Sequence, residues 1–480
     1  MSTKKFTFNL ILCLLTILSI HFLNGGKTFA QSMETIKIYG TPAGVSTRYI
    51  GGVEGSINFD IKDLQDLGVN TFRIYGGMSR WEAQDDDGKY GWPSIAEIKT
   101  NPNIINWDWW DNIMTNPPND TDYWSSGIPG EVWQGNARKI FAELKQADIL
   151  PVVSIRNVSN NWEPSWSLQL NPPRTDEDWN EWWEHVFATV YWLNVRNDYH
   201  VDEWEIHNEP DNREQGWGGN QADYFELVKV GRDAIDYVYK NYLPGRTYHL
   251  HAPKSVGGSS WPANVLQAIP TYFDSVNVHN YDVDISQYTQ RVHEWMNGTI
   301  HANSPLWIGE WGTYKREYDE VPFSINLIKN LIRGSQPGNN YIYGSHIFSL
   351  YDWGKEPIFQ GLVGARGKRR VSYYAFRMGI RALQGGRNTF LTSNANPNMM
   401  AIATKDDSSN IYLLMANSGE ESYKFNADFS DLVSTGTGQM WEFSSKVMDE
   451  VVRNLTLKDG NVGLTIPANA AILIKLKAVP

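Results

Sequence analysis

The chain of 480 residues is too long for one compact sandwich, and it has room for one large barrel and a smaller domain. A hydrophobic content of 41% and a charged content of 20% are typical of a soluble globular protein and exclude a disordered chain or an integral membrane protein. The formal net charge of −12 argues against nucleic acid or an anionic membrane surface as a partner.

Residues 1–30 are predicted to be a signal peptide. A basic start is followed by an apolar run over residues 10–20, and small residues precede a cut after Ala30. The only cysteine, Cys13, lies in this run, so the mature chain would have no disulfide and no thiol chemistry. We therefore expect a secreted protein, extracellular or periplasmic, that is a monomer and does not bind a membrane after cleavage.

From residue 31 onward, short β-rich runs alternate with stretches of helical periodicity. The predicted strands cover residues 35–39, 69–75, 149–155, 201–206, 247–251, 275–279, 306–309 and 341–350. The predicted helices cover residues 60–67, 137–147, 177–194, 224–239, 265–268, 288–297, 322–333 and 373–383. Eight strand–helix units predict a closed (β/α)8 TIM barrel over residues 31–386. Residues 35–40 have an alternative, which is to pair with the C-terminal domain.

An insertion rich in tryptophan covers residues 76–131, between the second strand and its helix. An insertion at this place lies on the face of the barrel where active sites are built. It is therefore either a wall of a substrate cleft or a surface subdomain packed on itself, and both alternatives remain open. Its acidic run at 85–88 is read as a solvated turn, because the rest of a calcium loop is missing, so no metal and no cofactor are expected.

The pattern of predicted secondary structure changes at residue 387. Apolar runs at 399–404, 411–416 and 471–476 are separated by turns rich in Asn, Ser, Gly and Asp, and no long helix intervenes. This pattern predicts a C-terminal antiparallel β-sandwich over residues 387–480.

Two glutamates follow strands of the predicted barrel. Glu209 ends the segment 204–210, where Pro210 stops the strand, and Glu310 ends the strand in 305–312. The two belong to the fourth and seventh units, whose strands face each other across the mouth of an eight-stranded barrel. Hydrolysis of a glycosidic bond needs one carboxylic acid to protonate the leaving oxygen and one carboxylate to attack. The sequence therefore predicts a pair of catalytic carboxylates.

These motifs, Asn-Glu-Pro at 208–210 and Ile-Gly-Glu-Trp-Gly at 308–312, resemble those of the clan A glycoside hydrolases, which are retaining (β/α)8 enzymes. The resemblance covers residues 36–385. It implies that Glu209 is the acid/base and Glu310 the nucleophile. The C-terminal sandwich gives a further resemblance to family 39, which includes xylosidase-like and exopolysaccharide-cleaving members. The tryptophan-rich insertion departs from the pattern for small substrates and favours a longer glycan.

The same resemblance implies six substrate-binding or supporting residues. Asn208 would contact the sugar 2-hydroxyl and the nucleophile, and Arg73 would hold the nucleophile ionised. The remaining members are His279 and Tyr281 after the sixth strand, Trp353 after the eighth, and Trp311, with Trp217 as a neighbouring candidate. Taken singly, Arg73 could also be a scaffold ion pair, and His279 and Trp353 could be core residues.

The expected function is that of a secreted retaining β-glycosidase acting by double displacement on a polysaccharide or oligosaccharide, with endo action. Three alternatives stay open: an exo-acting β-xylosidase-like enzyme, a non-catalytic glycan-binding barrel, and a metabolic barrel enzyme that uses a Schiff base or binds phosphate. The predicted signal peptide argues against the last of these, and no lysine is evident at a strand end.

Overall fold

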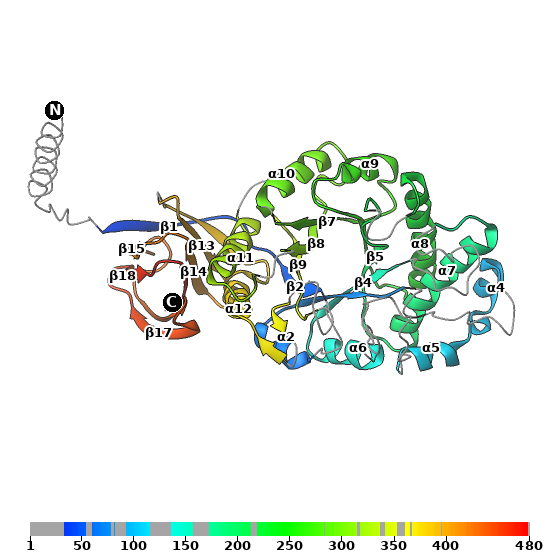
Figure 1. The fold of residues 1–480 in the computed structure, drawn as a ribbon, viewed down its shortest axis with the longest axis horizontal. Coiled ribbons are helices and arrows are strands. Elements are labelled where there is room, and N and C mark those ends of the chain that lie inside the picture. Colours follow the sequence, from blue (N-terminus) through cyan, green and yellow to red (C-terminus); the bar gives the residue numbers. More distant parts are fainter. Residues whose placement is uncertain are drawn as a thin grey trace, which may run out of the picture.

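The computed structural model shows a barrel of eight parallel strands beside a β-domain, with helices α11 (Val321–Gly334) and α12 (Val371–Leu383) between them (Figure 1). It describes residues 33–53, 60–77, 81, 93–115, 136–156, 172–212, 218–282, 284–313, 317–336, 341–352, 361–364, 367–394 and 396–478. The predicted signal peptide lies outside these residues.

The barrel strands follow one another in chain order: β2 (Tyr49–Val53), β3 (Thr71–Tyr75), β4 (Leu150–Ile155), β5 (Glu203–Ile206), β6 (His249–Ser255), β7 (Ser275–Tyr281), β8 (Leu306–Gly312) and β9 (Gly344–Phe348). The helices that follow strands, besides α11 and α12, are α2 (Ile61–Leu67), α6 (Ala137–Gln146), α7 (Asp176–Tyr191) with the π-helical turn η2 (Trp192–Arg196), α8 (Gln221–Tyr242), α9 (Trp261–Ala268) and α10 (Ile285–Met296). The predicted (β/α)8 barrel is confirmed.

The first predicted barrel strand, at residues 35–39, is wrong. These residues belong to β1 (Glu34–Val45), which pairs with strands of the C-terminal domain, as the alternative proposed. The barrel closes instead through β2, between β3 and β9. Its Gly51 packs so tightly that a Cβ there would lie 1.8 Å from the carbonyl oxygen of Thr71. Because glycine is depleted in strands, this segment gave no strand signal.

The insertion after β3 packs against the barrel's own helices where the structure describes it. It contains α4 (Ile95–Thr100), the short helix η1 (Pro102–Ile104) and α5 (Trp107–Ile113). The Trp107 ring stacks on Tyr191 of α7 at 5.1 Å, and the buried Trp110 lies 5.7 Å from His185. These tryptophans therefore belong to a packed subdomain, and Trp92 and Trp124 lie outside the described residues.

The C-terminal domain is a mostly antiparallel sheet, in which β1 and β15 are the only parallel pair among the described residues. In chain order, its further strands are β12 (Asn388–Thr392), β13 (Met399–Lys405), β14 (Asn410–Asn417), β15 (Tyr423–Asp428), β16 (Gly436–Phe443), β17 (Met448–Thr456), β18 (Asn461–Ile466) and β19 (Ala470–Ala478). The order is β17-β16-β19-β14-β13-β12-β1-β15-β18. Residues from both ends of this sheet share one hydrophobic cluster, so the sheet folds over as a sandwich. Two short antiparallel strands of two residues each, β10 (Val363–Gly364) and β11 (Lys368–Arg369), precede α12.

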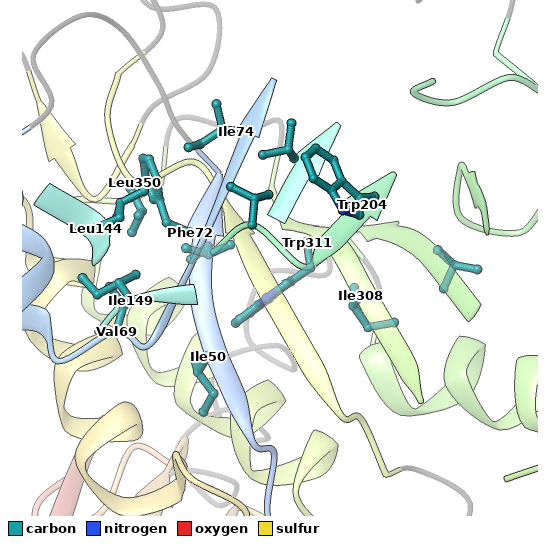
Figure 2. Packing of buried hydrophobic residues seen from close by; sticks show 14 of the residues in the cluster. Ile50, Val69, Phe72, Ile74, Leu144, Ile149, Trp204, Ile308, Trp311 and Leu350 are labelled. Atoms are coloured by element: carbon teal, nitrogen blue, oxygen red, sulfur yellow. The ribbon is translucent and has the colours of Figure 1, made fainter. Parts of the chain in front are cut away.

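Strand β14 joins the two domains, because its alternate side chains face two different cores. Leu413 and Met415 lie in the cluster inside the sandwich, whereas Tyr412 and Leu414 lie in the larger cluster that surrounds the barrel. Figure 2 shows part of that larger cluster, to which barrel strand β3 contributes Phe72. Because this hydrophobic cluster lies between the strands and the helices, side chains that point into the lumen of the barrel can be polar. The site described below lies in that lumen.

A buried ion pair also holds the domains together, and it gives a test of their coupling. Asp449 on β17 is fully buried and accepts hydrogen bonds from Arg377 and Arg381 of α12, each at 2.7 Å. Substitution D449A would leave both guanidinium groups without their buried partner. We expect the free energy of unfolding, measured by urea titration, to fall by about 2–3 kcal/mol. D407A, at an exposed aspartate, is the control, and equal stability of the two variants would contradict the role of the ion pair.

Candidate active site

The two predicted glutamates meet at the carboxyl ends of the barrel strands. Glu209 follows β5, and Glu310 lies in β8. Together with His279, they form a buried group in which one carboxylate oxygen of each glutamate and one ring nitrogen all lie within 4.8 Å of one another. Glu209 has a φ of 46°, a left-handed backbone that is uncommon outside glycine and that clusters at functional sites.

A bulge in β8 turns Glu310 toward the lumen of the barrel. In the pairing of β7 with β8, Val278 lies opposite Ile308, whereas the next residue, His279, lies opposite Glu310. Gly309 is the extra residue, and a Cβ there would lie 2.4 Å from the side-chain oxygen of Asn277. Bulges commonly re-aim a side chain next to an active site, so a glycine at 309 allows Glu310 to face Glu209.

Arg73 on β3 connects the groups around the glutamates, and its side chain is fully buried. Its Nε donates to Glu205 at 2.7 Å, and its terminal nitrogens donate to Glu310 at 2.7 Å and to the side-chain oxygen of Asn208 at 2.9 Å. Burial alone would lower the pKa of Arg73, but the carboxylates of Glu205 and Glu310 raise it well above its usual value. The guanidinium is therefore permanently charged and fixes the nucleophile candidate.

Two tyrosine hydroxyls complete the surroundings of Glu310. Tyr75, two residues after Arg73, donates to one carboxylate oxygen, and Tyr281 donates to the other at 2.5 Å. Burial would raise the pKa of Glu310, but the charges of His279 and Arg73 and both hydroxyls lower it to about 2. Glu310 is therefore ionised at any ordinary pH.

The other glutamate has a different set of partners. The Nδ1 atom of His279 lies 2.8 Å from an oxygen of Glu209 and 3.4 Å from an oxygen of Glu310, so one ring nitrogen contacts both carboxyl groups. The side-chain amide of Asn212 donates to the second oxygen of Glu209 at 3.1 Å. Among the described residues, no arginine or lysine side chain contacts the carboxyl group of Glu209, whose backbone N–H donates to the carbonyl of Lys254 at 3.1 Å. This separates its surroundings from those of Glu310.

Solved structures with the same fold cover almost the whole chain. A glycoside hydrolase family 30 endoxylanase from Clostridium papyrosolvens C71 is similar with a TM-score of 0.64 and 15% identity, over 93% of this chain and 100% of that one. The family 39 enzyme from Xanthomonas axonopodis pv. citri gives 0.63 and 14% over 95% and 100%. A monomeric β-xylosidase from Caulobacter crescentus CB15 gives 0.64 and 15% over 93% and 100%.

This is the fold of the family 30 and family 39 glycoside hydrolases. The resemblance to clan A enzymes is thereby confirmed at the level of fold, for the barrel and the β-domain together. No protein-family model matches the chain, and no curated protein matches it. No helix in the described part of the chain is both long and apolar enough to span a bilayer.

Five of the six predicted supporting residues can be located. Arg73, Asn208, His279 and Tyr281 surround the glutamates, but Trp311 does not. It follows Glu310 directly and so points to the opposite face of β8, where it is 4% exposed and packs 6.2 Å from Phe376 of α12 (Figure 2). Trp311 is therefore a core residue, and its prediction as a substrate contact is corrected. Trp353 and Trp217 lie outside the described residues.

The sequence did not reveal a buried lysine beneath the glutamates. Lys254 lies in β6, which runs to Ser255, whereas the predicted strand stopped at 251, before Pro253. The register of β6 shifts between Pro253 and Ser255, and Lys254 has a φ of 57°. This bulge turns the lysine into the lumen, so the statement that no lysine lies at a strand end is wrong. The sequence 249–255, His-Leu-His-Ala-Pro-Lys-Ser, offered no apolar run that could have indicated an inward lysine.

Lys254 stabilises the network rather than offering a free amine. Its Nζ lies 2.7 Å from Glu205 and donates to the Ser154 hydroxyl at 2.6 Å and to the carbonyl of His207 at 2.7 Å. Three acceptors occupy its three protons, and its side chain is fully buried, so it is unsuited to forming a Schiff base. Glu205 also accepts from Asn277 at 2.7 Å, and its neighbours Arg73 and Lys254 lower its pKa against the effect of burial.

The group of Glu209, His279 and Glu310 has ligand types that could bind a metal ion. Both oxygens of Glu310, however, already accept hydrogen bonds, and the Arg73 guanidinium lies 2.7 Å from one of them. A permanent positive charge at this distance opposes a second cation. The arrangement is better suited to moving protons and attacking a carbon atom than to holding a metal.

The lysine network predicts a large effect on stability. Substitution K254M would leave the buried Glu205 and Glu310 to share Arg73 as their only strong cation. We expect the free energy of unfolding to fall by about 2–4 kcal/mol in chemical denaturation. The control is K229M, at a half-exposed lysine on α8, where the change is expected to stay within about 0.5 kcal/mol. A K254M protein as stable as this control would show that the lysine does not contribute to the stability of the barrel.

Proposed function

We propose that this chain is an exported retaining β-glycosidase that hydrolyses O-glycosidic bonds of a polysaccharide by double displacement, with Glu209 as acid/base and Glu310 as nucleophile. The observation that carries the proposal is the facing pair itself, in which carboxylate oxygens of the two glutamates lie within 4.8 Å of each other. The fold shared with glycoside hydrolases supports it. Export rests on the sequence pattern of residues 1–30.

The short distance between the glutamates favours retention of configuration. Retaining enzymes hold the two carboxyl groups about 5–5.5 Å apart, whereas inverting enzymes separate them by about 6.5–9.5 Å to admit a water molecule. One oxygen of each glutamate lies within 4.8 Å of the other, which favours the shorter of these two separations. Glu310 therefore attacks the anomeric carbon directly while Glu209 protonates the leaving oxygen, and Glu209 then deprotonates the water that hydrolyses the intermediate.

Asn208 is positioned to contact the sugar beside the reacting carbon. Its side-chain oxygen accepts from Arg73, which fixes the amide and leaves its NH2 group to donate. We assign this NH2 to the 2-hydroxyl of the sugar bound at Glu310. Hydrogen bonds to this hydroxyl strengthen in the transition state of glycoside hydrolysis.

Endo action is supported by a hollow of about 390 Å³ that adjoins the site. It is lined by Tyr281, which contacts Glu310, by its neighbour Asn280, and by Gln287 and Arg291 of α10. These polar groups offer room and hydrogen bonds to a sugar beyond the one that is cleaved. The alternative is exo action, since the structurally similar proteins include a β-xylosidase as well as an endoxylanase. Oligomers as first products from a xylan or glucan would support endo action, and release of single sugars alone would support exo action.

Substitution of the nucleophile gives the most direct test. E310Q is expected to abolish turnover of an aryl β-glycoside, and azide should restore activity to E310A with inverted product, because the small anion fills the space of the missing carboxylate. E209Q should lose about 10²–10⁴-fold in kcat/KM on substrates with a poor leaving group and much less on dinitrophenyl glycosides, whose leaving group needs no protonation.

The anomer formed first by the wild-type protein, followed by NMR, should have the configuration of the substrate. An inverted first product would exclude double displacement. Normal turnover by both E310Q and E209Q would exclude the assignment of the pair. Oligosaccharide binding without any release of reducing ends would instead identify a non-catalytic glycan-binding barrel.

The hydroxyl of Tyr75 predicts a shift in the pH profile. The pKa of Glu310 is lowered to about 2, so its ionised form, and with it activity, is lost only as the pH falls through that low value. Substitution Y75F removes one donor to the carboxylate. A hydrogen bond to a charged group contributes about 1.5–3 kcal/mol, so this pKa should rise by about one to two units. Relative to wild type, kcat/KM of Y75F should therefore fall more at pH 4 than at pH 7. Y272F, at a surface tyrosine, should leave the profile unchanged; an unchanged profile for Y75F would contradict the role of its hydroxyl.

A further inference from the structure

The β-domain presents a polar face that the proposed reaction does not use. Residues directly opposite one another on paired strands project from the same face of a sheet. Two such rows cross β17, β16 and β19, namely Asn454–Gln439–Lys475 and Thr456–Thr437–Lys477. On β16, Trp441 follows Gln439 by two residues and therefore extends the same face.

This face is hollowed. Both rows, together with Trp441 and Arg381 of α12, line a hollow of about 1030 Å³, a volume at the upper end of those that bind ligands. Gly438 lets β16 and β19 approach closely, because a Cβ there would lie 2.2 Å from the carbonyl oxygen of Lys475. The floor is thus a rigid sheet, and its side chains are amides, hydroxyls, amines and one indole.

The charge of the hollow is opposite to that of the chain. Arg381, Lys475 and Lys477 line it, and no acidic residue does within the described part of the chain, whereas the chain as a whole has a net charge of −12. Among the described residues, neither lysine forms an ion pair with a carboxylate, and the amine of Lys475 lies 5.6 Å from the centre of the Tyr412 ring. Arg381 is held in place by the buried Asp449. A local excess of positive charge is suited to binding anions.

The remaining lining residues are suited to sugars. Amides and hydroxyls such as those of Gln439 and Asn454 pair with sugar hydroxyls, and the part-exposed ring of Trp441 offers a flat apolar surface. Arg381 lies 5.2 Å from the centre of that ring and orients it. Cations, amides and an aromatic ring on one sheet face match a glycan that carries carboxylate groups.

We propose that this hollow is a second, non-catalytic binding site for an acidic polysaccharide with uronic acid residues. The inference rests on the proposed function in that it takes the ligand to be a glycan. Arg381 lies in the last turn of α12, and barrel helices end at the face opposite the catalytic one, so the hollow would anchor the chain to acidic polymer rather than extend the cleft.

Binding can be measured apart from hydrolysis by using the E310Q variant. The probes are polygalacturonate, alginate and glucuronoxylan, each compared with its own carboxyl-reduced form by affinity electrophoresis and calorimetry. We expect at least one acidic form to bind about tenfold or more tightly than its reduced form, with an affinity that falls as salt is added. The double variant K475Q/K477Q should lose this preference. K424Q/K458Q, which removes the same charge from exposed lysines elsewhere in the β-domain, should keep it.

Substitution W441A should weaken binding of the acidic and reduced forms alike, and thermal unfolding of each variant checks that it is folded. The proposal is overturned if no acidic polymer binds better than its reduced form, if the two double variants bind equally, or if a single-stranded oligonucleotide binds more tightly than every polysaccharide. Hydrolysis of aryl β-glycosides by the wild-type chain is measured separately. Binding without hydrolysis would therefore contradict the proposed function and support the second binding site. Hydrolysis without binding would support the proposed function and contradict the second binding site.

Discussion

The buried guanidinium of Arg73 is the constraint on which the rest of the site depends. A charge removed from water must be compensated, and here Glu205 lies on one side and Glu310 on the other, both at 2.7 Å. Arg73 carries one positive charge between two carboxylates, and Lys254, whose amine lies 2.7 Å from Glu205, supplies a second cationic partner. The lumen of the barrel is therefore ionic where many barrels are apolar, and the hydrophobic core lies outside the strands, against the helices.

Bulges make this ionic lumen possible. Strict alternation would place Glu310 outside the barrel, because Trp307 faces inward, toward the rings of His251 and His346. The extra residue Gly309 reverses the alternation, turns Glu310 inward and sends Trp311 to the core. A second bulge does the same for Lys254. Both irregularities lie at the carboxyl ends of the strands, where loss of regular pairing costs least and where the reacting groups are needed.

Residues at the ends of strands could be predicted from the sequence. Residues whose direction depends on a bulge in the strand could not. Glu209 and Glu310 could be located because each lies at the end of a predicted strand. The role of Trp311 was wrong because alternation from Glu310 cannot be counted through an unseen bulge, and Lys254 was missed because Pro253 signals the end of a strand. The first barrel strand was missed because Gly51 has no side chain with a strand preference. Glu205 was passed over, since only contacts between distant strands show that its charge is compensated.

The contacts of the two glutamates differ in the way that the proposed reaction requires. Arg73 donates to Glu310, and two tyrosine hydroxyls donate to the same carboxylate, so its ionised form is stabilised and its pKa is lowered to about 2. The carboxyl group of Glu209 has no arginine or lysine side chain beside it among the described residues, and its partners are His279 and Asn212. A retaining glycosidase needs one carboxylate that stays ionised to attack and one carboxyl group that can carry a proton to the leaving oxygen. The surroundings of the two glutamates therefore favour the proposed roles, because the attacking group is held by a fixed positive charge and the proton donor is not in contact with that charge.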